Sequence, residues 1–387
     1  MRFIFPALIT LLLTACATTP VPTRSLDLFA DRHFRPASER IDAAAVFAMN
    51  EAMQQYLATH IIPETKRKSR HQALFDALYA KQQLKLEYDA AMTRNATQAF
   101  AARTGNCLSL VIMTAAFAKQ LDLQVRYQSV LTDETWSRSG DLYLSSGHVN
   151  LALSSPVDPS RTATTETRSY IIDFLPPADV KGYRTHIISE STIVAMYMNN
   201  RSVETLAAGR IDDAYWWARA AIDHEPTFIP AYNTLGVVLA RHGHVPEAER
   251  VFRHVVAAEP ANAAALANLV PLLETSGRLA EAADWRAKLA RIEPFPPYHY
   301  FNLGVQAMQA RDFLAARNWF AKEIDRAAYQ HDFHFGLALA NYYLGDLKQT
   351  EKHLAIALKN ATTRADRDLY AAKLDRLKNP TPQQPSR

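Results

Sequence analysis

Three residues with the side chains needed for thiol chemistry occur along the chain in the order cysteine, histidine, aspartate. Cys107 follows a glycine turn and begins an apolar run that predicts a buried helix. The unpaired N–H groups and positive dipole end of a helix N-terminus stabilise an anion, so a thiol placed there ionises more readily than free cysteine. His148 and Asp173, the two partners that such a thiolate needs, lie in strand-like apolar segments.

Each of these residues also has a structural interpretation. A lone cysteine in an apolar helix is commonly a small buried hydrophobe. His148 by itself fits a hydrogen-bonded strand histidine, and Asp173 by itself fits a carboxylate that caps a turn at a strand end. Their order, and the type of element that carries each of them, favour one shared site.

The run Arg103-Thr104-Gly105-Asn106-Cys107-Leu108-Ser109, followed by a histidine strand and an aspartate strand, resembles the transglutaminase-like superfamily of papain-type folds. The resemblance covers about residues 70–185. It implies Cys107 as nucleophile, His148 as general base and acid, and Asp173 as the carboxylate that orients the imidazole. Members include transglutaminases, peptidases, amidases and catalytically dead binding modules, so the resemblance does not select a substrate.

The surrounding elements predict an α+β domain over residues 41–190. Apolar positions recur at helical spacing over 42–57 and 72–91, and these helices should pack on the one that begins at Cys107. The alternation over 123–131 predicts the first strand of a sheet. A polar, proline-broken stretch over 155–168 predicts a surface connection between the histidine and aspartate strands.

The N-terminus has the layout of a signal peptide over residues 1–15, with one early positive charge and a short apolar core. Leu13-Thr14-Ala15-Cys16 resembles the bacterial lipobox, which implies cleavage before Cys16, attachment of lipid to its sulfur, and an outer-membrane protein facing the periplasm. The alternative is a secreted protein with a chance cysteine. Residues 16–40 lack a sustained period and suit a linker.

Composition excludes several classes of protein. The chain has 387 residues, a net charge of +4 that is dispersed along its length, and two cysteines. We therefore expect no nucleic-acid partner. No phosphate loop, zinc spacing or dinucleotide fingerprint occurs, so we expect no cofactor and no metal. His331 and His334 are one helical turn apart, but His334 falls at an inward position, which favours packing over metal ligation.

The second half of the sequence has a 34-residue period. Gly209, Gly243, Gly277 and Gly345 fall on one grid, and alanines and prolines share it. A period of 34 residues with paired helices is the tetratricopeptide signature, so residues 195–361 predict an all-α solenoid. The units are 195–226, 227–260, 261–294, 295–328 and 329–361, followed by a capping helix over 362–378 and a disordered tail over 379–387.

The outer units deviate from the pattern. Arg201 and Thr205 stand where the first helix should be apolar, Thr350 replaces the usual alanine, and Arg311 replaces the grid glycine. The resemblance to tetratricopeptide proteins implies a concave surface formed by the first helix of each unit, which would bind a protein or peptide partner. The predicted groove residues are Asn233, Arg241, Glu274, Tyr298, Phe301, Gln309, Tyr342 and Tyr343; the alternative for Tyr298 and Phe301 is packing against the neighbouring unit.

Three functions from different classes fit these features. The first is a thiol enzyme that hydrolyses an amide or peptide bond, with the backbone N–H of Cys107 in the oxyanion hole and a second donor upstream, for which Gln82 and Gln83 are candidates. The second is a transglutaminase that transfers the acyl group to an amine. The third is a catalytically silent binding or assembly scaffold. Hydrolysis is favoured over cross-linking because no residue pattern identifies an acceptor site that excludes water.

Overall fold

The computed structural model describes residues 26–80, 83–84, 86–139, 142–155, 169–174 and 184–379. The predictions that lie outside these residues concern the signal peptide, the expected lipid attachment at Cys16, Gln82, the polar connection over 156–168 and the tail beyond Asn379. Within the described ranges, no helix is both long and apolar enough to cross a membrane.

The N-terminal half begins with short helical elements and leads to one longer helix, α4, which starts at Cys107. In chain order these elements are η1 (Leu26–Leu28), η2 (Asp31–His33), α1 (Glu51–Tyr56), η3 (Leu57–Ile61), η4 (Ile62–Lys66), α2 (Arg70–Tyr79), β1 (Glu87–Tyr88), α3 (Ala96–Ala102), β2 (Thr104–Gly105) and α4 (Cys107–Gln120).

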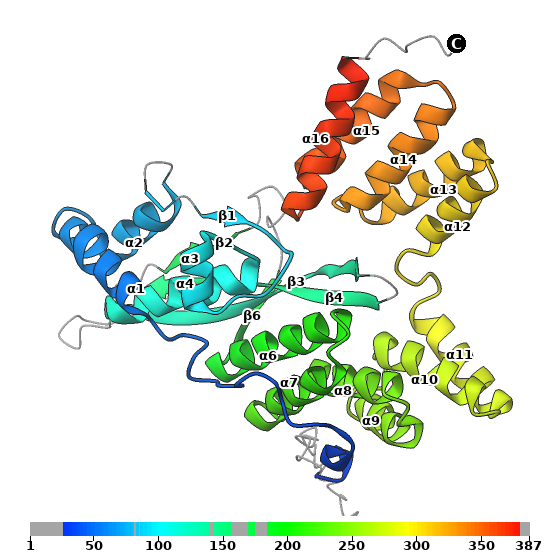
Figure 1. Cartoon of the computed structure of the whole chain (residues 1–387), viewed down its shortest axis with the longest axis horizontal. Coiled ribbons are helices and arrows are strands. Elements are labelled where there is room, and N and C mark those ends of the chain that lie inside the picture. Colours follow the sequence, from blue (N-terminus) through cyan, green and yellow to red (C-terminus); the bar gives the residue numbers. More distant parts are fainter. Residues whose placement is uncertain are drawn as a thin grey trace, which may run out of the picture.

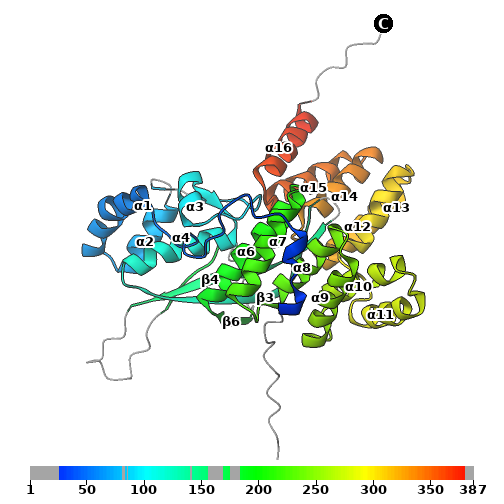
Figure 2. The same ribbon diagram turned by 60° about the horizontal axis from the view of Figure 1, so that its bottom comes forward.

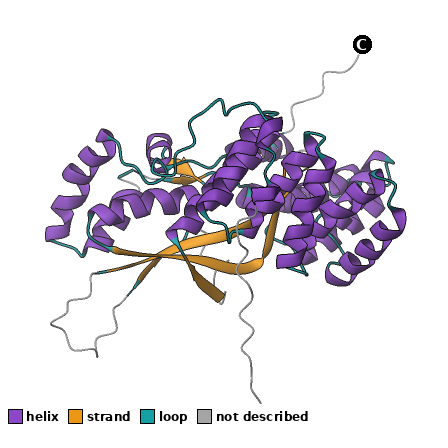
Figure 3. Cartoon of the chain, turned by 90° about the horizontal axis from the view of Figure 1, so that it is seen from below, coloured by secondary structure: helices purple, strands orange, loops and turns teal. Residues whose placement is uncertain are grey.

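A sheet follows α4. Its described strands, β3 (Gln124–Ser139), β4 (Leu142–Ser154), β5 (Tyr170–Ile172) and β6 (Arg184–Ile188), are antiparallel and lie in the order β5-β4-β3-β6. Figure 3 shows the strands as a layer on one side of the helices. Apolar side chains of β4, such as Val149 and Leu151, share a fully buried core with those of α4. The N-terminal half is therefore an α+β region, as its sequence predicts.

Both helices predicted before Cys107 are shorter in the structure. The predicted helix over 42–57 begins only at Glu51, because the Asn50 side chain caps it by accepting from the Met53 N–H at 3.0 Å. The predicted helix over 72–91 ends at Tyr79, and β1 occupies part of its range. The backbone of β1 pairs in parallel with β2 instead of continuing a helix.

The C-terminal half is a tetratricopeptide-type solenoid. Five helix pairs and a final helix follow one another through the described residues 184–379. They are α6 (Glu190–Ala207) with α7 (Ile211–His224), α8 (Ile229–Arg241) with α9 (Val245–Ala258), α10 (Ala263–Thr275) with α11 (Leu279–Ile292), α12 (His299–Gln309) with α13 (Phe313–Arg326), α14 (His331–Tyr343) with α15 (Leu347–Asn360), and α16 (Arg364–Lys378).

The grid glycines are explained by the turn within each helix pair. Gly209, Gly243, Gly277 and Gly345 all have positive φ angles, between 76° and 88°. This left-handed conformation ends the first helix and suits glycine, which has no Cβ. Arg311 takes the same place in the fourth pair with φ 60°, so the fold imposes the turn there even though a non-glycine residue costs about 1–2 kcal/mol.

The solenoid contacts the N-terminal half at both of its ends. At the first end, the N-terminal arm (residues 26–40) runs along α7, where Phe34 stacks on Tyr215 with ring centroids 3.8 Å apart (Figure 2). At the last end, the Ala90 N–H donates to the Thr362 carbonyl at 2.9 Å. Figure 1 shows the array leaving the sheet at α6 and returning with α16 beside β1. The chain therefore closes on itself near the start of α4.

Candidate functional site

The local structure before α4 fixes Cys107 as the first residue of that helix. Helix α3 ends at Arg103, which adopts the left-handed conformation (φ 55°) and turns the chain into β2. Asn106 then caps α4, and its side-chain oxygen accepts from the Ser109 N–H at 2.9 Å. Cys107, which is half-buried, thus lies among the first-turn N–H groups that have no acceptor within the helix.

Gly105 is required by space rather than by its φ angle. A Cβ at this position would lie 2.6 Å from the Ser109 Cβ, closer than real contacts allow. Ser109 cannot move aside easily, because its Oγ donates to Asn106 Oδ1 at 2.7 Å and accepts from the Arg94 N–H at 2.8 Å. The close packing of Gly105 and the hydrogen bonds between Asn106 and Ser109 therefore fix the turn that places the thiol at the start of α4.

The sheet register brings Asp173 to His148. Strand β4 pairs with β5 so that Leu151 lies opposite Ile172, and continuing this register puts Asp173 opposite Asn150. His148 Nε2 lies 2.7 Å from Asp173 Oδ1, and Asn150 Nδ2 donates to Asp173 Oδ2 at 2.8 Å. Each carboxylate oxygen of Asp173 therefore has its own hydrogen-bond partner. These partners, His148 and Asn150, point to the same face of β4.

The electrostatics of the site favour a protonated imidazole. Burial lowers the pKa of His148, but its hydrogen bonds with Asp173 and Cys107, together with their charges, raise the pKa to about 9. Because an ionised carboxylate only accepts, His148 donates from Nε2 to Asp173 and has Nδ1 for the thiol. The structure thus joins Asp173 and His148 by a hydrogen bond and places Cys107 close enough to His148 for their charges to interact, so the three residues form one series.

Sequence reasoning missed two residues beside this series. Asn150 holds Asp173, and the only signal in the sequence is its position two residues after His148 on an alternating strand. Tyr88 lies close enough to Cys107 for their charges to interact, and burial is the main cause that raises its pKa, so the phenol stays protonated. By contrast, Gln83 is exposed after α2, which gives no support to its expected place in an oxyanion hole.

The predicted groove residues do not share one surface. Tyr298 is 2% exposed and packs edge-on against Phe301 and Phe333, so it belongs to the interior of the repeats. Phe301 packs on the buried cluster around Phe320. For Tyr298 the prediction of a groove surface is wrong, because Phe333 of the next unit covers this ring. Phe301 is half-buried and also packs against Phe333, which favours the alternative of packing against the neighbouring unit. The other groove residues are half-buried or exposed: Asn233, Arg241, Glu274, Gln309, Tyr342 and Tyr343.

The paired histidines of the fifth unit do not form a metal site. His331 Nδ1 lies 2.8 Å from the Tyr370 hydroxyl, whereas His334 Nδ1 lies 3.0 Å from His353 Nδ1. The two side chains therefore have separate partners. No group of three or more potential ligands among the described residues is placed to hold a metal ion.

Comparisons with known proteins concern the repeats alone. No family model matches the chain, and no curated protein matches it. Among solved structures, a thermophilic TPR protein of Thermus thermophilus is 19% identical, covering 46% of this chain and 98% of its own, with a TM-score of 0.30. PilF of Pseudomonas aeruginosa is 19% identical over 50% of this chain and 96% of its own, with a TM-score of 0.28.

A third similar structure is YrrB, described as a TPR protein with an unusual peptide-binding site. It is 16% identical, covering 46% of this chain and 92% of its own, with a TM-score of 0.25. Likenesses this weak carry no argument about function. The repeat architecture of this chain stands on its own helix pairs and on the left-handed turns within them.

Proposed function

We propose that the N-terminal half is a transglutaminase-like thiol domain that hydrolyses an amide or peptide bond. The observation that carries the proposal is the His148–Asp173 hydrogen bond, together with the interaction between His148 and the nearby Cys107. A carboxylate that fixes one imidazole tautomer beside a thiol at a helix N-terminus is the arrangement that thiol acyl transfer requires.

The reaction follows from these groups. The Cys107 thiolate attacks the substrate carbonyl carbon, and the resulting oxyanion is stabilised by N–H groups at the start of α4. The C–N bond breaks as protonated His148 gives its proton to the leaving amine, which leaves a thioester. Neutral His148 then takes a proton from water, the hydroxide oxygen bonds to the acyl carbon, and the carboxylic acid leaves as the thiolate reforms. An amine in place of water would give cross-linking.

The test is the pH dependence of iodoacetamide labelling of Cys107. In the full chain carrying Cys16→Ser, so that Cys107 is the only thiol, we expect labelling well below pH 8, with an upward shift in His148→Ala and a smaller one in Asp173→Ala. Identical profiles near the free-thiol pKa of about 8.5 in all three proteins would reject the thiol function and favour a silent scaffold. Release of product with and without an added amine separates hydrolysis from cross-linking.

The repeats are proposed to recruit a protein or peptide partner. Tyr342 and Tyr343 support this role because they are 53% and 58% exposed and form an edge-to-face pair on α14. Exposed aromatic residues are common anchors in protein interfaces. Replacing both with Ala should weaken a partner recovered by cross-linking, whereas Leu279→Ala, at an exposed position on α11 outside the predicted groove, should not. Equal recovery in the two variants would exclude this surface.

We also propose that Cys16 carries a lipid and that the chain faces the periplasm from the outer membrane. The Leu13-Thr14-Ala15-Cys16 sequence supports this localisation. Cys16→Ser should prevent processing or release the protein from the membrane fraction. Recovery of the unmodified wild-type protein in the soluble periplasmic fraction would contradict the proposal.

A further inference from the structure

One short segment lies between the thiol helix and both ends of the solenoid. We call residues 88–94 the bridge segment. It begins at Tyr88 on β1, which pairs with Gly105 two residues before Cys107, and it ends at Arg94, whose N–H donates to Ser109 on the first turn of α4. Its position lets it connect the repeats with the start of the thiol helix.

The contact at the first end of the solenoid is buried and centres on Thr93, which is 1% exposed. The Thr93 N–H donates to Glu204 Oε1 on α6 at 2.6 Å. Its Oγ1 accepts from Asn200 Nδ2, also on α6, at 3.1 Å and from Asn106 Nδ2 at 2.9 Å. One side chain therefore joins the first repeat helix to the residue that caps α4.

The Asn106 side chain depends on Thr93 to keep the orientation in which it caps α4. Its Oδ1 accepts from both the N–H and the Oγ of Ser109, while its Nδ2 has Thr93 as acceptor. An amide with both ends bonded cannot rotate without breaking a bond, so Thr93 fixes the orientation of the cap. Because Cys107 is the next residue, the same contact fixes where the thiol enters the helix.

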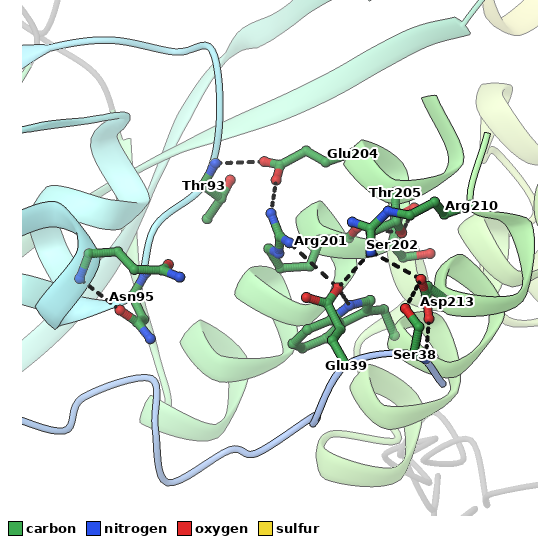
Figure 4. Close-up of polar contacts among 12 residues, drawn as sticks. Ser38, Glu39, Thr93, Asn95, Arg201, Ser202, Glu204, Thr205, Arg210 and Asp213 are labelled. Carbon is green, nitrogen blue, oxygen red and sulfur yellow. Dashed lines mark hydrogen bonds and ion pairs between the residues drawn. The ribbon is translucent and has the colours of Figure 1, made fainter. Parts of the chain in front are cut away.

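Glu204 is itself fixed from the repeat side. Figure 4 shows Glu204 between Thr93 and Arg201, and Arg201 continuing to Glu39 on the N-terminal arm. The Arg201–Glu204 ion pair has an N–O distance of 2.8 Å, and Glu39 also accepts from Trp217 Nε1 at 2.8 Å. The polar residue Arg201, which departs from the apolar repeat pattern, thus serves a contact outside the repeats.

The contact at the last end of the solenoid is looser. The Ala90 N–H donates to the Thr362 carbonyl at 2.9 Å, and Arg367 Nη2 reaches the Tyr88 carbonyl at 3.4 Å. A cavity of about 290 Å³, lined in part by Arg103 and Arg367, remains between β1–β2 and α16. The bridge segment is therefore held more tightly at the first end of the solenoid than at the last end.

We propose that the solenoid positions Cys107 through the bridge segment, with Thr93 and Glu204 as positioning residues. The proposal rests on the proposed thiol function and extends it, because it makes α6 part of the thiol site although it is the first repeat helix. The thiol domain cut away before α6 would then keep Cys107, His148 and Asp173 but lose the α6 contacts that hold Thr93 against Asn106.

The test compares two isosteric changes, Thr93→Val and Thr205→Val, in the full chain with Cys16→Ser. Thr205 is a matched control: it is 1% exposed on α6, but its hydroxyl donates only to carbonyls of its own helix. Thr93→Val should slow labelling of Cys107 about 3-fold to 10-fold at neutral pH and shift the labelling pKa upward. It should also speed hydrogen exchange at the first-turn amides of α4. Thr205→Val should match the parent protein in both measurements.

The outcomes separate this proposal from the thiol function. If His148→Ala shifts the labelling profile and Thr93→Val does not, the triad stands and the bridge proposal is overturned. Equal exchange of the α4 amides in Thr93→Val and Thr205→Val would overturn it even if labelling showed no thiol activation. Should Thr93→Val fail to fold, Asn200→Ala removes one of the two donors to Thr93 Oγ1 and should slow labelling about 2-fold; unchanged labelling in that variant would also overturn the proposal.

Discussion

His148 in the sheet and His334 in the fifth repeat unit are equally buried, yet the protein shifts their pKa values in opposite directions. Each side chain is 4% exposed. Burial lowers the pKa of both, but hydrogen bonds with Asp173 and Cys107 reverse the effect at His148 and raise its pKa to about 9. Burial dominates at His334, where a backbone carbonyl only partly opposes it and the pKa is lowered.

The difference shows that burial alone keeps a histidine neutral at neutral pH, and that acidic partners can reverse this effect. A carboxylate and a thiolate favour the imidazolium at His148, whereas at His334 the charge of Lys352 adds to the effect of burial. His334 and His353 can share one proton between their Nδ1 atoms, which are 3.0 Å apart, but they cannot both be charged at that distance. The first site is suited to proton transfer and the second to packing.

The largest expected effect is on stability at the sheet site. The folded pKa of His148, about 9, lies above the unfolded value of about 6.5, so its contribution is fully present below pH 6.5 and is lost as pH rises through 9. His148→Ala should therefore destabilise the protein by on the order of 2–3 kcal/mol more in mild acid than in alkali. Urea unfolding from about pH 6 to about pH 9 measures this difference. A pH-independent difference would contradict the charged pair.

The repeat site should show the opposite sign. Burial, followed by the charges of His334 and Lys352, lowers the pKa of His353 to about 4. Folded and unfolded states then bind protons alike above about pH 6.5, and stability is lost as pH falls from there towards 4. His353→Gln should remove on the order of 1–2 kcal/mol of this loss while His148→Ala leaves it in place. The same acid dependence in His353→Gln and the parent would show that the pair does not titrate as described.

The sequence predicts the repeats more completely than it predicts the sheet, because the contacts that define a repeat are local. A left-handed turn between paired helices favours glycine, so Gly209, Gly243, Gly277 and Gly345 mark four of the turns directly. The burial of Tyr298 was not readable, because it depends on how Phe333 of the next unit packs against it.

In the thiol region, the sequence indicated Cys107, His148 and Asp173 but missed the residues that hold them, whose contacts are made across the sheet or by a distant helix. The Gly105-Asn106 turn before Cys107 is local, and the cap and close packing of the structure explain it. The role of Asn150 depends on the pairing of β4 with β5, and the register of this pair cannot be inferred from the sequence of either strand alone. Thr93 likewise depends on α6, more than a hundred residues away along the chain.

The smallest expected effect concerns Asn150, and it tests whether the carboxylate must be held as well as present. Asn150 Nδ2 donates to Asp173 Oδ2 at 2.8 Å while His148 donates to Oδ1, so the amide stabilises the ionised carboxylate and prevents its rotation. In Asn150→Leu, Asp173 loses this donor, the imidazolium of His148 becomes less stable, and the thiolate beside it loses part of its counter-charge. Labelling of Cys107 at neutral pH should therefore slow by about 3-fold to 10-fold, less than in His148→Ala.

Asn341→Leu is the matched control, because Asn341 is also buried at 3% exposure and donates only to a carbonyl of its own helix, far from the thiol in the fifth unit. This variant should lose stability and keep the parent labelling profile. If Asn150→Leu also keeps that profile while its stability falls, Asn150 stabilises the sheet alone. The difference between the two histidine sites then depends on Asp173 itself and not on the hydrogen bond from Asn150. If the labelling profile shifts in Asn150→Leu alone, the groups that orient the partners of His148 also contribute to the difference between the two histidine sites.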